Sequence, residues 1–120
     1  MGLTSIKISL TNPQRPELGE QEVELIVDTG SVLPWIPKRV LNKLDLRPRR
    51  KRVFRTIDGK ELERDVGMVT IKYDEHEADV EVVFAEEKDT PVLGVVALES
   101  LGYRVNPITG KLEYVGLLAV

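Results

Sequence analysis

Apolar and polar residues alternate over several short segments of this chain, which is the periodicity of half-buried β-strands. Residues 11–19 contain two prolines and a glycine, so the first two segments are expected to pair as a hairpin around this loop. The segments that predict strands are residues 6–10, 23–27, 53–57, 60–65, 66–73, 78–84, 103–105 and 112–115. A chain patterned in this way is expected to fold as an all-β protein.

Two short helices are expected between the strands. Pro37 can open the first, because proline is favoured at the first helical position, and Leu41 and Leu44 would share its buried face. The second would span about residues 95–101 and end at Gly102, since glycine tolerates the left-handed conformation that often follows a helix.

The composition removes several classes of function. The chain has 120 residues without a linker, which suits one domain over residues 1–120. Cysteine is absent, which excludes disulfides, thiolate metal sites and a cysteine nucleophile, and the single histidine leaves little for a Ser-His triad or a histidine-rich zinc site. The net charge of -3 gives no general attraction to nucleic acid or to an anionic membrane. Residues 1–10 do not resemble a signal peptide, so a cytoplasmic location and no membrane partner are expected.

The residues best suited to chemistry are Asp28, Thr29, Gly30 and Ser31, which follow an apolar run at residues 25–27. A carboxylate at the end of such a run is expected to be partly buried, which costs energy unless hydrogen bonds or a proton compensate. Thr29 and Ser31 offer hydroxyl groups at short range, and Gly30 lets the backbone bend without a side-chain clash. A structural alternative is that Asp28 only caps a turn or the helix that follows.

A second motif has a similar setting. Val92, Leu93 and Gly94 also follow a β-rich stretch and precede a predicted helix, as the Asp28 segment does. This similarity between the two segments is short, so it supports a functional prediction only together with the residues around Asp28.

Residues 28–37, Asp-Thr-Gly-Ser-Val-Leu-Pro-Trp-Ile-Pro, resemble the active-site segment of pepsin-like aspartic proteases, in which Trp, an aliphatic residue and Pro follow Asp-Thr-Gly-Ser at the same spacing. The rest of the chain resembles the retropepsin-like, single-lobe branch of that family. This branch has a late apolar-apolar-Gly motif before a short helix, which Val92-Leu93-Gly94 matches. The ending Asn106-Pro107 through Gly110-Lys111-Leu112 is also similar, with Asn106 in place of Asp. The resemblance covers about residues 4–115.

The resemblance implies a retropepsin-like acid-protease lobe, closed like a β-barrel, that is active as a twofold homodimer. In this family two facing carboxylates share one proton and activate a water molecule, so one Asp28 per chain requires a second copy. The implied function is an aspartic endopeptidase that cleaves peptides without metal, cofactor or covalent intermediate. Thr29 would brace the pair across the dimer, Gly30 would keep the turn tight, and Ser31 would hydrogen-bond Asp28.

The hairpin around Asp58-Gly59 resembles the flap that closes over bound peptide in this family. The dipeptide favours a tight turn in which both central residues take φ > 0, and an ordinary exposed turn is the alternative. The residues expected to bind substrate are Ser31, Ile57, Asp58, Gly59, Val92, Leu93 and Gly94.

Six of the nine residues from Arg47 to Arg55 are basic. They could bind nucleic acid, or they could form a solvated edge strand balanced by the acidic residues between Glu61 and Asp89. We expect the solvated edge strand and no nucleic-acid partner.

Two other functions remain as alternatives: a non-catalytic dimeric peptide-binding module of the same fold, and a nucleic-acid-associated module. Trp35 is expected in the core, and His76 is expected to be exposed in a polar turn.

Overall fold

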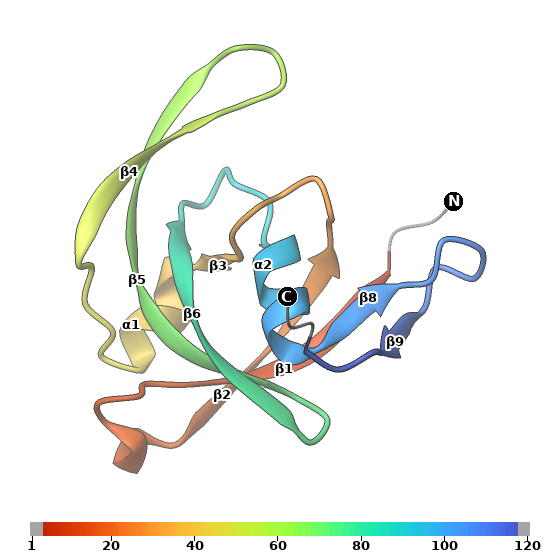
Figure 1. The fold of residues 1–120 in the computed structure, drawn as a ribbon. Coiled ribbons are helices and arrows are strands. Elements are labelled where there is room, and N and C mark those ends of the chain that lie inside the picture. The colour runs from red at the N-terminus through yellow and green to blue at the C-terminus, as the bar shows by residue number, and fades with distance from the viewer. Residues whose placement is uncertain (1–3, 118–120) are drawn as a thin grey trace.

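The computed structural model describes residues 4–117. The predicted strands and two short helices occur in the expected order, except that the segments 60–65 and 66–73 form one continuous strand and that short strands at 35–37 and 92–93 are added (Figure 1). In chain order the elements are β1 (Ser5–Thr11), the 3-10 helix η1 (Pro16–Leu18), β2 (Glu20–Val27), β3 (Trp35–Pro37), α1 (Lys38–Lys43), β4 (Arg50–Arg55), β5 (Glu61–Tyr73), β6 (His76–Ala85), β7 (Val92–Leu93), α2 (Val95–Leu101), β8 (Tyr103–Val105) and β9 (Leu112–Tyr114).

Most of the strands form one sheet that closes on itself. Its strand order is β1-β2-β7-β3-β6-β5-β4, and β1 also pairs with β5, so β4 is left outside the ring. β1 and β2 pair antiparallel from Ser5↔Ile26 to Thr11↔Glu20, which confirms the expected hairpin. β8 and β9 form a separate two-stranded sheet. The closed, mostly β fold predicted from the sequence is therefore confirmed.

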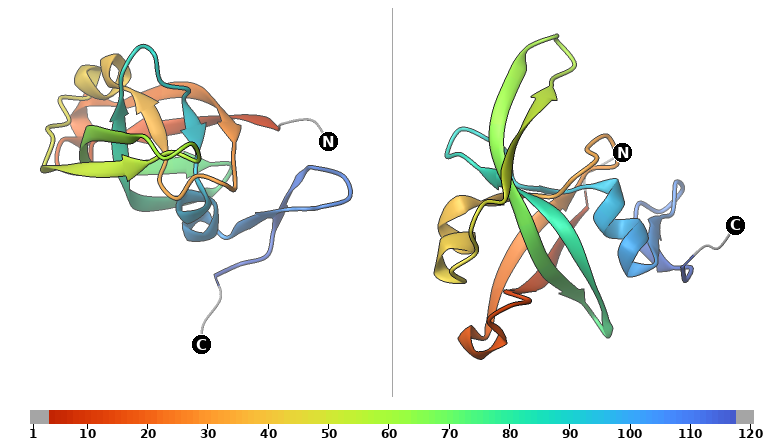
Figure 2. Two further views of the ribbon diagram at one scale, coloured as in Figure 1. Left: turned by 90° about the horizontal axis from the view of Figure 1, so that it is seen from above. Right: turned by 60° about the vertical axis from the view of Figure 1, so that its left-hand side comes forward.

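Apolar side chains from the inner face of the ring and from both helices fill the core. Ile6, Ile8 and Leu10 alternate inward on β1, as their spacing predicts. Leu41 and Leu44 are fully buried at the end of α1, with Pro37 directly before the helix. Figure 2 shows α1 and α2 on opposite sides of the ring, so each helix closes a different side. No helix among residues 4–117 is long and apolar enough to cross a membrane.

The β4–β5 arm (residues 50–65) projects from the ring. Among residues 4–117, β4 pairs only with β5, whereas β5 pairs with β6 from Val66 onward, so no other described strand lies beside the arm (Figure 1). The tip is not the expected two-residue turn, because only Gly59 has positive φ, at 88°. The Thr56 amide donates to the Lys60 carbonyl at 2.9 Å, and the Gly59 amide donates to the Thr56 carbonyl at 3.0 Å. This is a three-residue loop that ends in a left-handed glycine.

Two local expectations are wrong. His76 is the first residue of β6 and is half-buried, because its ring stacks on Tyr114 at 4.0 Å between centroids and its Nδ1 lies 3.0 Å from the Tyr103 hydroxyl. Trp35 is only half-buried, and its ring packs edge-on against the ring of Phe54 in the arm, with 5.1 Å between the ring centroids. The aromatic rings contact partners that are far away in the sequence, which local pattern does not show.

Candidate active site

The Asp28 turn (residues 28–31) leaves the end of β2 in the middle of the sheet. β2 pairs in parallel with β7, so that Ile26 lies opposite Val92 and Val27 opposite Leu93. The Asp28 amide donates to the Leu93 carbonyl at 3.2 Å. The two motifs that echo each other in the sequence therefore lie side by side.

Gly94 packs directly against the backbone that follows the Asp28 turn. The amides of Val95 and Val96, at the start of α2, donate to the carbonyls of Ser31 and Val32 at 2.8 and 3.1 Å. A Cβ atom on Gly94 would lie only 2.6 Å from the Val32 carbonyl oxygen and 2.7 Å from the Leu33 carbonyl group. Because these are backbone atoms that cannot rotate away, only glycine fits at this position.

The Asp28 carboxylate is held by the turn itself. The Gly30 amide donates to Asp28 Oδ1 at 2.9 Å, and the Ser31 amide donates to the Asp28 carbonyl at 3.1 Å. Ser31 Oγ donates to the Leu33 carbonyl at 2.9 Å, so the expected bond from this hydroxyl to the carboxylate is wrong. Asp28, Thr29 and Gly30 are exposed in the single chain, which corrects the expectation that the carboxylate is partly buried. The turn offers an ordered carboxylate at an open surface.

A cleft of about 510 Å³ separates the Asp28 turn from the β4–β5 arm. Val32 and Val53 are 64% and 59% exposed and Ile57 is fully exposed, which makes the walls largely apolar. The residues that line the cleft are Asp28, Gly30, Ser31, Val32, Leu33, Trp35, Val53, Phe54, Arg55, Thr56, Ile57, Thr90 and Val92.

The expected substrate-binding residues divide into two groups. Ser31, Ile57 and Val92 line the cleft. Leu93 is fully buried and Gly94 is buried beneath the turn, so these two do not line it. Asp58 and Gly59 form the tip of the arm next to Ile57, outside the lining of the cleft in the single chain.

Thr29 faces a second hollow on another side of the turn. This groove of about 640 Å³ runs between α2, β8 and the segment that follows β9. Apolar side chains form much of its wall, among them Val95, Leu98, Val115 and Leu117. The cleft and the groove thus meet at the Asp28 turn, with Asp28 in one and Thr29 in the other.

The basic residues at 47–55 have acidic neighbours in the fold. Arg50 and Arg52 both bind Glu81, at 2.8 and 2.6 Å, and Lys51 binds Asp65 at 3.0 Å. Although partial burial raises the pKa of Glu81, the hydrogen bonds from the two arginines outweigh it and lower the pKa. The acidic balance expected from the sequence is confirmed for Arg50, Lys51 and Arg52.

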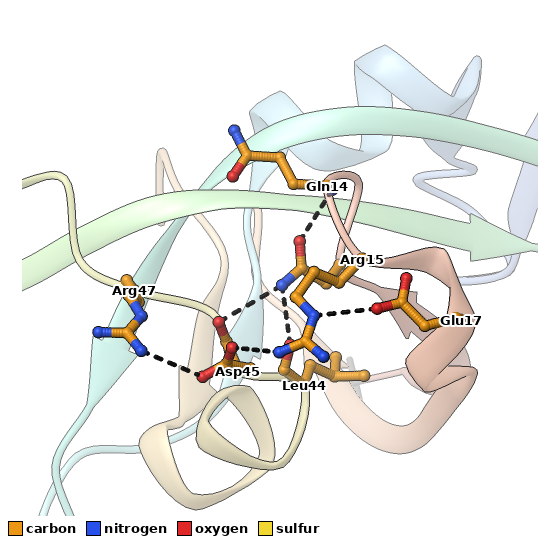
Figure 3. Close-up of polar contacts among 7 residues, drawn as sticks. Gln14, Arg15, Glu17, Leu44, Asp45 and Arg47 are labelled. Carbon is orange, nitrogen blue, oxygen red and sulfur yellow. Dashed lines mark hydrogen bonds and ion pairs between the residues drawn. The ribbon is translucent and has the colours of Figure 1, made fainter.

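Another ionic cluster lies at the end of α1 (Figure 3). Arg15 bridges Glu17 at 3.0 Å and Asp45 at 2.7 Å, and Arg47 approaches Asp45 at 3.8 Å. The buried amide of Asn12 donates to the Leu44 carbonyl at 2.8 Å. These contacts hold the β1–β2 loop against α1, at the opposite end of the ring from the Asp28 turn. Among residues 4–117, no three His, Asp or Glu side chains are grouped so that they could hold a metal ion.

Arg64 and Asp89 form an ion pair that the sequence does not reveal. Arg64 Nε lies 2.7 Å from Asp89 Oδ2, Arg64 Nη2 lies 2.9 Å from Oδ1, and the side chains expose only 9% and 8% of their surface. The Glu86 amide also donates to Asp89 Oδ2, at 2.8 Å. The hydrogen bonds from Arg64 lower the pKa of Asp89, although burial opposes them. No spacing rule joins two oppositely charged residues so far apart in the chain.

Asp89→Asn should destabilise the protein by about 1.5–3 kcal/mol at neutral pH, because it weakens a hydrogen bond to a charged group. Since the folded pKa of Asp89 is depressed, its contribution is fully present above the unfolded value of about 3.9. It is lost as pH falls through the lower, folded pKa. Urea unfolding of both proteins from pH 7 down to acid should therefore show a constant gap that closes only below about pH 4. A gap that closes near pH 6 would contradict this assignment.

The closed ring, with the Asp28 turn supported by β7 and α2, defines a known class of fold. It matches the crystal structure of a retropepsin-like aspartic protease from Rickettsia conorii with a TM-score of 0.51 and 16% sequence identity, over 88% of this chain and 89% of the other. The fold is therefore that of a retropepsin-like lobe. Residues 15–97, which contain both Asp28 and Val92-Leu93-Gly94, match the family model of aspartyl proteases, and the chain belongs to this family. No curated protein is significantly similar to it in sequence.

Proposed function

We propose that this protein is an aspartic endopeptidase whose active site forms between two copies of the chain. The observation that carries the proposal is the Asp28 carboxylate, ordered by the Gly30 amide and exposed at the floor of a largely apolar cleft. The reaction needs two carboxylates that share one proton, and the sequence has a single Asp-Thr-Gly. A twofold axis beside the turn would bring the second Asp28 to face the first.

In the proposed reaction, one Asp28 of the dimer is ionised and the other is protonated. The ionised carboxylate takes a proton from a water molecule whose oxygen attacks the peptide carbonyl carbon. The protonated carboxyl group gives its proton to the carbonyl oxygen, which yields a neutral tetrahedral intermediate with two hydroxyl groups on the former carbonyl carbon, a diol. The carboxyl group that took the proton from water then gives it to the amide nitrogen, and the other carboxylate takes a proton from a hydroxyl group of the diol as the C–N bond breaks. The two carboxyl groups again share one proton. The reaction consumes one water molecule and involves no covalent bond to the enzyme.

The β4–β5 arm is the proposed flap. It projects from the ring on the side of the cleft, and its residues Val53 to Ile57 form one wall. Closing over bound peptide would exclude water, which strengthens the electrostatic interactions of the two carboxylates. The apolar walls favour peptides that place bulky apolar side chains beside the bond to be cleaved.

The groove beside Thr29 is the proposed dimer contact. Thr29 belongs to the same turn as Asp28, so a partner that faces Asp28 must also lie near this groove. Leu117 and Tyr114 expose 71% and 55% of their surface at this side of the molecule. Burying such side chains against a second copy would contribute favourable free energy in proportion to the apolar area removed from water.

Sedimentation at micromolar concentration should show about twice the chain mass of 13.5 kDa. Leu117→Asp should shift the protein toward the monomer, because it places a charge in the proposed apolar contact. Leu18→Asp on η1, far from the groove, is the matched control and should remain dimeric. A wild-type chain that stays monomeric at high concentration would contradict the proposal that the active site forms between two copies.

A further inference from the structure

We propose that the Arg64–Asp89 ion pair is a positioning device, which holds the root of the β4–β5 arm at a fixed place relative to the wall of the cleft. This inference rests on the function proposed above. Arg64 and Asp89 touch neither the Asp28 carboxylate nor the cleft, so they would act through the segments to which they belong.

Arg64 stands where the arm leaves the ring. It pairs with Arg52 of β4, whereas the pairing of β5 with β6 begins only at Val66. Among the described residues, β4 is the only strand beside β5 over 61–65, before Val66. The orientation of the arm therefore depends on β5 itself and on the side-chain contacts of Arg50, Arg52 and Arg64 with the ring.

Asp89 stands at the other side of this junction, in the segment between β6 and β7. Thr90 and Val92, which follow it, line the cleft, and Leu93 then accepts the hydrogen bond from the Asp28 amide. The bond from the Glu86 amide fixes the Asp89 carboxylate within its own loop. The ion pair thus connects the arm to the loop that leads into β7, the strand that supports the Asp28 turn.

The geometry of the pair suits this role better than any other ionic contact of the arm. Two parallel hydrogen bonds between a guanidinium and a carboxylate fix both direction and distance. Lys51–Asp65 and Arg55–Glu61 join β4 to β5 within the arm, and both pairs are largely exposed. These two pairs cannot fix the arm relative to the ring. Arg50 and Arg52 do join the arm to Glu81 of β6, but their side chains are 62% and 45% exposed and each donates one hydrogen bond, whereas the Arg64–Asp89 pair is buried and bidentate.

Hydrogen exchange in the ligand-free protein tests the proposal without any assay of activity. Asp89→Asn should speed exchange of the arm amides at residues 50–65 by about tenfold or more, because local opening at the root becomes easier. The amides that pair β1 with β2 report global unfolding, so their exchange should speed only as far as the lower global stability of Asp89→Asn requires, and less than that of the arm amides. Asp65→Asn, which removes an exposed charge from the same arm, is the matched control and should leave the arm nearly unaffected. Equal effects of the two variants, or uniform acceleration over the whole chain, would overturn the proposal.

Kinetics separate positioning from simple stabilisation. In Asp89→Asn the KM for a peptide substrate should rise about tenfold with kcat nearly unchanged, because a loosened arm weakens binding of substrate and transition state alike. The double variant Arg64→Met/Asp89→Leu should recover stability, since apolar residues often replace a buried pair without loss. It should not recover KM, because the directional contact is absent, and full recovery of KM would contradict positioning. If the wild type cleaves no peptide, the proposed function fails, whereas hydrogen exchange still decides whether the pair holds the arm.

Discussion

Asp28→Asn should abolish peptide cleavage while the fold remains intact. The side-chain oxygen of asparagine can still accept the hydrogen bond from the Gly30 amide, so the turn keeps its internal support. The amide cannot take a proton from water at the same position, and loss of acid–base function costs roughly 10²–10⁴-fold in rate. Cleavage of a peptide library, followed by mass spectrometry, and circular dichroism of the same sample measure the two properties separately.

Mixing the variant with the wild type tests whether both copies of Asp28 are needed. With equal amounts of the two chains and free exchange of subunits, only about a quarter of the dimers carry two intact carboxylates. Activity per wild-type chain should therefore fall by about half. Asp74→Asn is the matched control, because Asp74 is exposed at the β5–β6 turn with a φ of 58°, which asparagine also tolerates. Cleavage that persists in pure Asp28→Asn would point to another site. A wild type that binds peptides without cleaving them would identify the chain as a non-catalytic binding module.

Gly94→Ala should damage both the fold and the site. The added methyl group would meet the backbone of Val32 and Leu33 at 2.6–2.7 Å, so β7, α2 or the Asp28 turn must move. We expect a loss of about 3 kcal/mol or more in unfolding free energy, at the upper end of the range for overpacking. A shift of the turn by about 1 Å would also lower kcat/KM by about a hundredfold.

Gly19→Ala separates this clash from backbone strain. Gly19 has a φ of 78° but no atom within 4 Å of the position of a new Cβ, so alanine there is strained without a collision. A loss of roughly 1–3 kcal/mol is expected, with kcat/KM unchanged, because Gly19 also has a ψ of -164°, in a region that only glycine adopts readily. Gly94 has a φ of -81°, which alanine adopts freely, so any larger loss at Gly94 comes from the collision. Normal activity in Gly94→Ala would show that the turn can move without harm.

The sequence predicts the parts of the molecule that local chemistry determines. α2 spans Val95–Leu101 and Gly102 follows in the left-handed conformation with a φ of 90°, as the apolar spacing and the glycine indicate. The echo between the Asp28 segment and Val92-Leu93-Gly94 also corresponds to a real contact, because both motifs end a buried strand in the same sheet. Sequence patterns of this kind predict the structure correctly because each combines the burial of side chains with a specific requirement of the backbone.

The remaining features depend on partners that are distant in the chain. β3 has only three residues, too few for alternation to be visible, and it forms because Trp35 and Ile36 pair with Val83 and Phe84. Ser31 binds the Leu33 carbonyl instead of Asp28 because the turn brings that carbonyl within 2.9 Å. The Arg64–Asp89 pair has no sequence signal at all, since both residue types are common at exposed positions.

The parallel pairing of β2 with β7 also bears on when the site can appear during synthesis of the chain. The segments that meet there are separated by β3, β4, β5 and β6, so a long loop must close before Val92 and Leu93 can join Ile26 and Val27. Contacts between such distant segments form late, because the entropy of loop closure is lost before any contact compensates for it. The Asp28 turn would therefore acquire its shape only after the rest of the ring is in place. A nascent chain that has not yet emerged from the ribosome beyond α2 would have Asp28 but not the strand and helix that support its turn.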